Sequence, residues 1–272
     1  MTTATDHSLW DERAAHFDDW GTPLRPPAED LALYAAFVER CFVATSTPVP
    51  TLLLGVTPEL ASTRWPVPLR LTAIDQSEPM VRRVWPGDVA DQRRALVGDW
   101  MRFAPDETPS LVLTDGAPVF FADPQVLFER VRTLLAPDGA FVVRAFCAPP
   151  QRERVDDVLA DARHGAIENF HLFKWRIAMA LQEQAREGVA QQRVWSVIHA
   201  ADIDFEALPQ PGFSARAVST LRFYREQAGT LHFPTRQAYS RMLRESFDRV
   251  ESAHAGHCGG ECFSVFLARK AR

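Results

Sequence analysis

The sequence predicts an α/β fold: a doubly wound, mostly parallel seven-stranded sheet with a C-terminal antiparallel hairpin and a helical insertion that serves as a lid. Five short apolar runs recur between residues 51 and 146. They are almost continuously apolar instead of alternating, which is typical of parallel strands covered by helices on both faces. Two strand-like runs at the end of the chain, joined by a glycine-containing turn, predict the hairpin that closes the sheet.

The predicted strands follow one another along the chain, and each of the first five ends in a small or polar residue. Their ranges are 51–56, 69–75, 93–99, 110–116, 139–146, 247–255 and 262–270. Residues 122–139 form the clearest helix between them, because apolar residues at helical spacing precede a Pro-Asp-Gly sequence. These apolar residues are Val126, Phe128, Val131, Leu134 and Leu135.

About a hundred residues separate the fifth strand from the hairpin, which is too many for one crossover. Within them, 152–163 and 166–184 predict helices. One face of the second helix carries Ile167, Phe170, Lys174, Ile177 and Leu181. We expect the Lys174 stem to extend so that its ammonium reaches water. The chain thus divides into an N-terminal helical lid segment (1–46), a cofactor-binding sheet core (47–146 with 247–272) and a largely helical substrate-binding insertion (147–246).

Composition narrows the choice of partners. The 272 residues carry 30 Lys plus Arg against 35 Asp plus Glu, a formal net charge of -5, and contain no block of like charge. A nucleic-acid or anionic-membrane partner is therefore disfavoured. No apolar run approaches the ~20 residues that span a bilayer, and the polar N-terminus is unlike a signal peptide. We expect a cytoplasmic protein, and the sequence leaves a homodimer open.

The cysteines are too few and too dispersed for a disulfide framework, so we expect reduced thiols. They are Cys41, Cys147, Cys258 and Cys262. Together with His254 and His257, the last two offer four zinc ligands. The CxxC spacing of zinc modules is missing, and a glycine-rich turn between two strands is the favoured interpretation. We therefore predict no metal site.

The first strand ends at Gly55, in the sequence TLLLGVTPELAS. A glycine-rich turn serves a dinucleotide because it lets the backbone approach the pyrophosphate and aims a helix N-terminus at it. Here the further glycines are missing, but Thr57 is a suitable N-cap and Pro58 suits the first helical position. Glu59 falls in the first turn of this short helix, and Pro66 ends it. The turn is compatible with a cofactor that has no pyrophosphate.

The ends of the next two strands carry carboxylates. Asp75 follows Gly55 by 20 positions, the spacing at which an acidic side chain meets the ribose hydroxyls of a nucleoside. Gly98, Asp99 and Trp100 end the third strand, with a carboxylate that can accept from an exocyclic amine and a ring that can lie against a purine. Three strand ends thus indicate one nucleoside site.

With these strand ends the chain resembles the class I S-adenosylmethionine-dependent methyltransferases. The motifs that carry the resemblance, in the family's order, are TLLLGVTPEL, LTAIDQSEPMV, ALVGDWMRFA, SLVLTDGAPVFF and LLAPDGAFVVRAF. The family's usual E/DxGxGxG is reduced to LLGVT. The resemblance implies S-adenosylmethionine as the cofactor. This sulfonium zwitterion has no phosphate and tolerates the missing glycines, whereas a nicotinamide dinucleotide would lose its main anchor.

The resemblance also implies roles for particular residues. Asp75 would hold the ribose, Gln76 and Met80 would flank the nucleoside, and Asp99 would face the adenine amine. Toward the sulfonium the implied residues are Gly55 and Thr57 beside the methionine, then Asp115 and Gly116 beside the reacting methyl.

The N-terminal segment is rich in aromatic residues, and in the resembled family such segments often fold across the mouth of the cofactor site. Trp20 and Arg25, in a loop that contains Gly and Pro, are the candidates for this lid. The alternative, that the rings pack on the outside of the sheet, is equally open.

Methyl transfer is an in-line displacement, so the protein mostly positions the nucleophile, and a base is needed only for an acceptor that arrives protonated. The first catalytic candidate is His171, which lies within one turn of Lys174 and Trp175, and the second is Tyr224. A lone histidine in a helical lid is more often a packing residue. Cys147 follows the fifth strand and can line the pocket, although a buried inert thiol is favoured. Further candidates are His199 and His232.

Three functions stay open. The first is a methyltransferase that acts on O or N of a small molecule. The second keeps the cofactor, but a nucleophile attacks another carbon of the sulfonium, by aminopropyl-carbon attack or cyclisation, and methylthioadenosine is released. The third is a catalytically silent partner protein that retains the fold.

Overall fold

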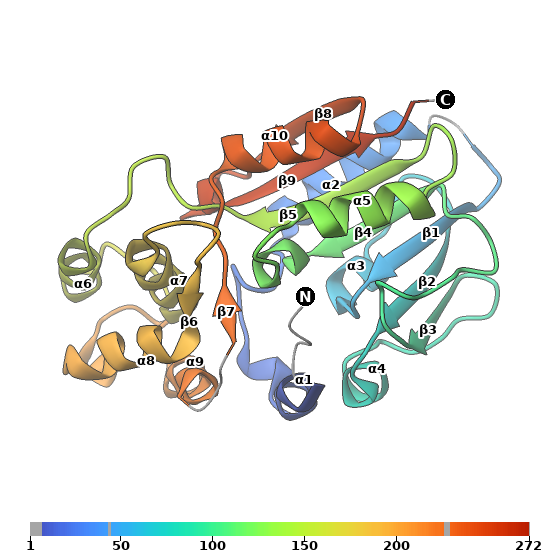
Figure 1. The fold of residues 1–272 in the computed structure, drawn as a ribbon. Coiled ribbons are helices and arrows are strands. Elements are labelled where there is room, and N and C mark those ends of the chain that lie inside the picture. The colour runs from blue at the N-terminus through green and yellow to red at the C-terminus, as the bar shows by residue number, and fades with distance from the viewer. Residues whose placement is uncertain (1–6, 43–44, 226–228, 272) are drawn as a thin grey trace.

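The computed structural model describes residues 7–42, 45–225 and 229–271 (Figure 1). Its centre is a seven-stranded sheet of order β3-β2-β1-β4-β5-β9-β8. The strands are β1 (Val49–Leu54), β2 (Leu69–Asp75), β3 (Arg93–Val97), β4 (Leu111–Asp115), β5 (Ala140–Phe146), β8 (Arg249–Ala253) and β9 (Phe263–Arg269). Strands β1 to β5 run parallel, and β9 lies antiparallel between β5 and β8. The predicted fold class and its C-terminal hairpin are confirmed.

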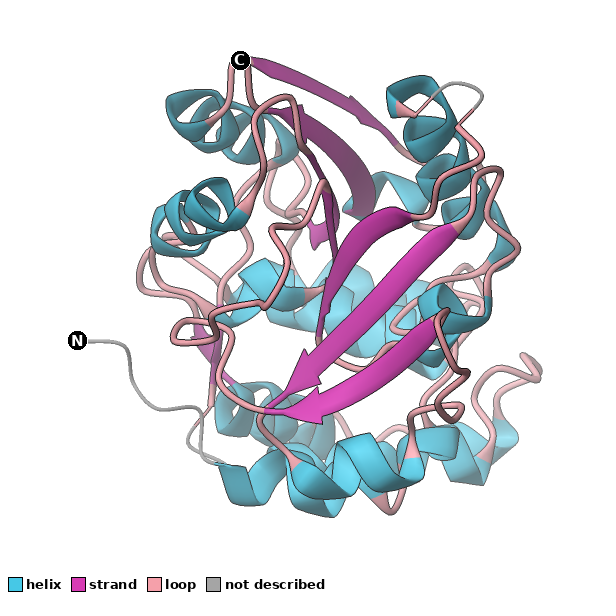
Figure 2. Cartoon of the chain, turned by 90° about the vertical axis from the view of Figure 1, so that its right-hand side faces the viewer, coloured by secondary structure: helices cyan, strands magenta, loops and turns pink. Residues whose placement is uncertain are grey.

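Helices cover both faces of this sheet, as continuously apolar strands require (Figure 2). One face carries α2 (Ala28–Cys41), α3 (Pro58–Ser62) and α4 (Glu78–Arg83), whose buried side chains join those of β1 and β4 in one apolar cluster. The other face carries α5 (Gln125–Leu134) and α10 (Arg236–Ser246). Helix α2 therefore packs as part of the sheet core, although it falls inside the predicted N-terminal segment.

Helix α5 has the apolar face that its spacing predicts, except at its start. Phe128, Val131 and Leu134 are buried against the sheet. Val126 is 45% exposed, so its predicted place on this face is wrong. Successive helical residues are turned by about 100°, and it is the next residue, Leu127, that faces the core.

Between β5 and α10 the chain builds a helical layer beside the sheet (Figure 1). Its elements are α6 (Val155–Arg163), α7 (Phe170–Leu181), α8 (Gln191–Ala200), α9 (Ala215–Ser219) and the short antiparallel strands β6 (Val189–Ala190) and β7 (Thr230–Leu231). The layer begins and ends at one place, because Ala148 forms an isolated bridge with Thr235. Helix α10 packs on α5 and the sheet, so the layer is shorter than the predicted insertion of 147–246.

All residues of helix α7 except Arg176 are buried, by the other helices of the layer and by side chains from outside it, such as Phe146 of β5. Lys174 is 0% exposed, so the expectation that its ammonium reaches water is wrong. The sequence reveals one apolar stripe, but α6, α8 and α9 cover the remaining sides of the helix as well. Across the described ranges, no helix is both long enough and apolar enough to cross a membrane.

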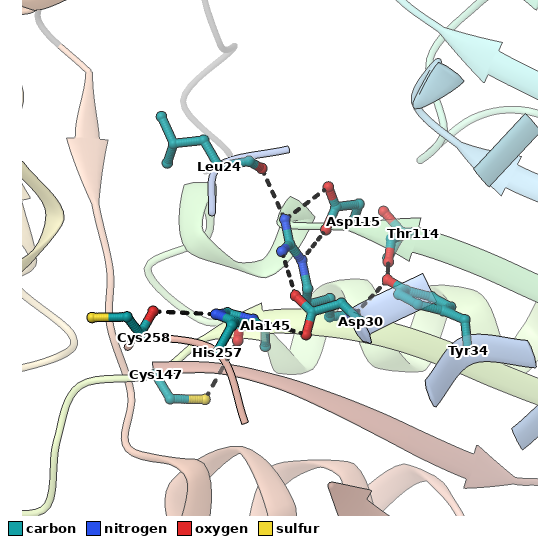
Figure 3. Close-up of polar contacts among 10 residues, drawn as sticks. Leu24, Asp30, Tyr34, Thr114, Asp115, Ala145, Cys147, His257 and Cys258 are labelled. Carbon is teal, nitrogen blue, oxygen red and sulfur yellow. Dashed lines mark hydrogen bonds and ion pairs between the residues drawn. The ribbon is translucent and has the colours of Figure 1, made fainter. Parts of the chain in front are cut away.

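Arg144 lies in the buried strand β5 and is itself fully buried. Its guanidinium donates to the two oxygens of Asp115 at 2.6 and 3.2 Å, to Asp30 at 2.7 Å and to the carbonyl of Leu24 at 2.8 Å. Figure 3 shows Asp30, Asp115 and Leu24 around this group. Since Asp115 ends β4, Asp30 lies in α2 and Leu24 precedes α2, one side chain joins two strands, a helix and the N-terminal segment.

Two further side chains extend this network (Figure 3). The Tyr34 hydroxyl donates to the carbonyl of Thr114 at 2.6 Å and accepts from the backbone N–H of Arg144 at 2.8 Å. His257 Nε2 lies 3.2 Å from Asp30 Oδ1 and thereby connects the loop between β8 and β9. Burying two carboxylates without a cation costs folding free energy. The positions of the carboxyl ends of β4 and β5 and of α2 therefore depend on Arg144.

Replacing Arg144 by Met should lower the free energy of unfolding by about 3 to 5 kcal/mol, because Asp30 and Asp115 would be buried without their partner. Urea denaturation followed by circular dichroism measures this loss. The matched change Arg132→Met, at an exposed position of α5, should stay within about 0.5 kcal/mol of the wild type. Equal losses in the two variants would contradict the role given to Arg144.

Candidate functional site

A cavity of about 480 Å³ lies at the carboxyl ends of the parallel strands. It opens where the strand order reverses, with β1 between β2 and β4, which is where ligands bind in open α/β sheets. Three parts of the chain line it: the strand ends with their loops, the N-terminal segment 10–26, and the helical layer.

The turn after β1 contains one glycine in the left-handed region, Gly55, with a φ of 90°. Helix α3 begins at Pro58 with Thr57 as its N-cap residue, as predicted, although the Thr57 side chain makes no capping hydrogen bond. The helix ends at Ser62, before the predicted stop at Pro66. Gly55 and Thr57 both line the cavity, so the short turn forms part of its wall.

The carboxylates of Asp75 and Asp99, at the ends of β2 and β3, line the same cavity. Asp75 accepts from the backbone N–H groups of Val56 at 3.3 Å and Ser77 at 2.9 Å. Asp99 accepts from Gln76 Nε2 at 3.2 Å. The two acids therefore belong to one wall. Gln76, the residue after Asp75, connects them through its hydrogen bond to Asp99.

Eleven of the twelve residues predicted to contact the cofactor lie in the cavity wall. They are Gly55, Thr57, Asp75, Gln76, Met80, Asp99, Trp100, Asp115, Gly116, Trp20 and Arg25. The exception is Gly98, whose backbone N–H donates to the carbonyl of Asp75 at 2.8 Å and continues the sheet. The cofactor roles of all twelve stay predictions.

Glu59 adds a further carboxylate to the cavity wall, although its sequence position predicts only a place in the first turn of a short helix. Its Oε1 accepts from Arg25 Nε, and Arg25 lines the cavity as well. Its Oε2 is buried and has no hydrogen-bond partner among the residues the structure describes. A buried carboxylate oxygen in this condition is suited to accept from a bound ligand.

Asp115 and Gly116 form the wall after β4. Burial raises the pKa of Asp115 to about 6, against the opposing effect of Arg144, so the carboxylate is mostly ionised at neutral pH. Gly116 has a φ of 69°, and a Cβ built on it would lie 2.7 Å from the ring of Phe146. Glycine is therefore needed here for Phe146 to reach the cavity.

The N-terminal segment joins the sheet core to the helical layer. Helix α1 (His7–Ala14) packs against α4, where Ser77 Oγ donates to Asp11 at 2.6 Å. Toward the helical layer, Arg13 donates to Gln191 of α8 at 3.1 Å. Figure 1 shows α1 between α4 and α9. The segment therefore closes one side of the cavity through contacts to both parts.

The aromatic residues of this segment divide between the two interpretations that the sequence leaves open. Trp10, Phe17 and Trp20 line the cavity. Tyr34 is instead buried in α2 against the sheet. The first three rings are thus placed for a lid, and the fourth is a core residue.

His171, the first catalytic candidate, does not line the cavity. Its Nε2 accepts from the backbone N–H of Gly21 at 3.0 Å. Burial, and secondly the charge of Lys174, lower the pKa of His171 to about 3. The neutral imidazole therefore holds the loop that carries Trp20, and nothing in its placement brings it to an acceptor.

Tyr224, the second candidate, lines the cavity from a 3₁₀ turn at Thr220–Tyr224. Burial raises the pKa of Tyr224, while the charge of Arg13 acts in the opposite direction. The phenol stays protonated at neutral pH, so its hydroxyl can donate a hydrogen bond to a ligand but does not serve as a ready base.

Lys174 lies directly behind this wall. Its ammonium donates to Thr220 Oγ1 at 3.2 Å and lies 5.1 and 4.7 Å from the ring centroids of Trp20 and Tyr224. Burial, followed by the nearby charge of Arg13, lowers the pKa of Lys174 to about 7. Two rings of the cavity wall are thus backed by a lysine that is partly protonated at neutral pH.

The remaining candidates lie outside the wall. Cys147 is buried, and burial raises the pKa of its thiol to about 12. His232 Nδ1 lies 3.0 Å from the carbonyl of Ala185, and His199 stacks on Trp195. Throughout the part of the chain that the structure describes, no group of three or more His, Cys, Asp or Glu side chains is placed to hold a metal ion.

No protein-family model matches the chain, and no curated protein matches its sequence. Solved structures match its fold. A candidate zinc-dependent alcohol dehydrogenase from Rhodobacter sphaeroides has a TM-score of 0.57 at 14% identity and full coverage of both chains. The N-methyltransferase NodS from Bradyrhizobium japonicum, in complex with S-adenosyl-L-homocysteine, has 0.51 at 13% identity over 98% of this chain and 99% of that one. A candidate O-methyltransferase from Nostoc punctiforme has 0.53 at 14% identity over 99% of this chain and 62% of that one.

The chain has the fold of the class I S-adenosylmethionine-dependent methyltransferases, as its strand-end motifs predict. At such identities the likeness concerns the fold, and one of the matched proteins is named for a different reaction. The function therefore has to be argued from the site itself.

Replacing the buried Lys174 by Met should stabilise the protein at pH 7 by on the order of 1 to 3 kcal/mol. The pKa of Lys174 is lowered on folding, so between about pH 7 and 10.5 the unfolded chain binds a proton that the folded chain has released. The wild type should therefore gain stability as the pH rises through this window, and its deficit against the variant should shrink.

Urea denaturation of both proteins at pH 7, 8, 9 and 10 measures this difference. Lys270→Met, at a partly exposed position, is the matched control and should not remove the pH slope. A difference between wild type and Lys174→Met that does not change with pH would contradict a lowered pKa at Lys174.

Proposed function

We propose that the protein is an S-adenosylmethionine-dependent methyltransferase that acts on an O or N atom of a small-molecule acceptor. The observation that carries the proposal is the joint placement of Asp75 and Asp99 in one cavity, beside the turn at Gly55. Acids at these strand ends suit the ribose hydroxyls and the adenine amine of a nucleoside. NodS, which has this fold, is a methyltransferase in complex with S-adenosyl-L-homocysteine.

The adenosine end of the site fits this cofactor. Each oxygen of Asp75 accepts a backbone N–H, and a carboxylate oxygen can accept more than one hydrogen bond, so the group suits a ribose hydroxyl. Asp99 is oriented by Gln76, and Trp100 and Met80 contribute a ring and a thioether to the same wall. These five residues would hold the nucleoside without any phosphate contact.

The methionine end fits through a pair that the family's glycine motif does not contain. Glu59 Oε2, buried and without a partner in the described structure, would accept from the α-ammonium. Arg25, bound to the other oxygen of Glu59, would face the carboxylate. A zwitterion needs one acceptor and one cation, and this pair offers both beside Gly55, which explains how the turn can lack further glycines.

When bound, the cofactor supplies a methyl group already activated by the sulfonium. The chain positions the acceptor and excludes water. The described wall contains neither His nor Lys, and Asp115 is bound by Arg144. We therefore place no strong base at the reacting atoms, and the acceptor would react as an amine or as an oxygen that has already lost its proton.

The other two functions are less well supported. A silent partner protein has no use for the unpartnered oxygen of Glu59 in a cavity of this size. Attack on another carbon of the sulfonium uses the same cofactor site, and products separate it: methyl transfer leaves S-adenosylhomocysteine, whereas aminopropyl attack leaves methylthioadenosine.

Asp75→Asn should weaken binding of both S-adenosylmethionine and S-adenosylhomocysteine by on the order of 10- to 100-fold, because the ribose hydroxyls lose a charged acceptor. Isothermal titration calorimetry measures both affinities, and thermal unfolding checks that the variant is folded. Asp106→Asn, at an exposed position, is the matched control and should bind like the wild type. Absence of binding to the wild type would end the proposal.

Glu59→Gln should reduce the affinity for S-adenosylhomocysteine by on the order of 10- to 100-fold and that for methylthioadenosine by less than about threefold. The second compound lacks the amino-acid moiety, so only the first uses the Glu59 carboxylate. Competition calorimetry measures the ratio, with Glu78→Gln on α4 as the exposed control. Equal losses for both ligands would place Glu59 elsewhere than at the ammonium.

A further inference from the structure

The two sides of the cavity differ in charge. The acidic residues of the described wall are Glu59, Asp75, Asp99 and Asp115, and all come from strand ends, their loops or α3. The wall that α1, the loop after it and the helical layer supply contains no acid within the described ranges. A ligand that fills the whole cavity therefore meets acceptors at one end and a different set of groups at the other.

Hydrogen-bond donors predominate at this second end. Arg13 contributes a guanidinium, and Tyr224 contributes a hydroxyl that stays protonated. Trp175 is only 4% exposed, and its indole Nε1 has no partner among the described residues; the same holds for Nε1 of Trp20. Since an indole N–H and a guanidinium can only donate, these groups select a ligand rich in acceptor atoms.

The charge behind this end is positive as well. Lys174, behind the rings of Trp20 and Tyr224, has no acidic partner among the described residues and donates there to the neutral Thr220. Glu12, whose charge also acts on Arg13, is exposed to water and is not part of the wall. An anion at this end would be stabilised by the guanidinium of Arg13 and by Lys174 in its protonated form, in a medium of low dielectric constant.

The surface between the donors is made of rings. Phe146 and Trp175 are 4.6 Å apart at an interplanar angle of 76°, and Trp10 and Phe120 are 5.6 Å apart at 81°. All four line the cavity. Phe146 also lies against Gly116, so the rings continue from the donor end to the wall after β4. Such faces and edges accommodate a flat ring.

We propose that the acceptor is a planar aromatic carboxylate, which binds with its charged group toward Arg13, Tyr224 and Trp175 and its ring against the aromatic wall. That this ligand is the methyl acceptor rests on the proposed function. That the cavity binds an aromatic carboxylate does not. The anchored carboxylate directs the opposite edge of the ring toward Asp115 and Gly116, where the resemblance places the methyl group.

Three flat molecules of almost the same shape test the charge preference: benzoate (negative), benzamide (neutral) and benzamidine (positive). Saturation-transfer NMR titrations are made on the protein alone and on the protein with S-adenosylhomocysteine. We expect benzoate to bind at least about tenfold more tightly than benzamide, and benzamidine to be the weakest. Equal affinities, or tighter binding of benzamide or benzamidine, would overturn the inference.

Two variants test the donors. Tyr224→Phe and Trp175→Phe each keep a ring and remove one N–H or O–H donor, so each should reduce the preference for benzoate over benzamide by about three- to tenfold. Trp195→Phe, outside the cavity wall, should leave the preference unchanged. If both donor variants keep the wild-type ratio, the carboxylate does not bind where we place it.

The outcomes separate the two proposals. If S-adenosylhomocysteine binds but the three molecules show no order, the acceptor class is wrong and the methyltransferase proposal is unaffected. If benzoate is preferred but neither cofactor form binds, the anion site is correct and the methyltransferase proposal fails.

Discussion

The buried guanidinium of Arg144 fixes the carboxyl ends of β4 and β5, beside which the site is built. It bonds to Asp115 beside the cavity and to Asp30 in α2, and so relates the wall to a helix on one face of the sheet. Through the carbonyl of Leu24 it also fixes the chain that leads into the N-terminal segment. A charge buried with its partners is demanding in geometry, because any displacement exposes an unpaired carboxylate. The network therefore sets position more than it adds stability.

At these carboxyl ends of the strands, the two ends of the cavity are built by different parts of the chain. The acidic end comes from short turns that follow strands, whose positions the sheet determines. The donor end comes from α1 and the helical layer, which meet through Arg13 and Gln191. One end thus has a geometry common to the fold, while the other depends on side chains particular to this protein. That division matches a shared cofactor and a specific acceptor.

The sequence predicts the first end well and the second poorly, for physical reasons. Gly55, Asp75 and Asp99 are defined by strand periodicity and short spacings, and the structure places them in one wall. Arg13 and Gln191 are 178 positions apart, so no local pattern indicates their contact. Lys174 was expected to reach water because one stripe of a helix does not reveal that the other sides are covered too.

Two of the missed features left a signal in the sequence. Arg144 is the single charge in the apolar run AFVVRAF, which is unusual for a strand buried on both faces and indicates a buried partner. Glu59, four positions after the glycine of the first turn, carries a charge next to the point where the backbone approaches a ligand. The role of His171 in holding Gly21 gave no such signal, because the two are 150 positions apart.

The bridge between Ala148 and Thr235 has a consequence for how such a chain diversifies. Because the chain leaves the sheet core at Ala148 and returns to it at Thr235, two paired positions, the helical layer is an insertion whose two ends lie side by side. Changes of length in its exposed loops are then absorbed between these two positions, whereas its buried residues that pack on Phe146 and Phe263 have to be kept. Grafting a foreign segment between these two positions is accordingly a direct route to altered selectivity on an unchanged scaffold.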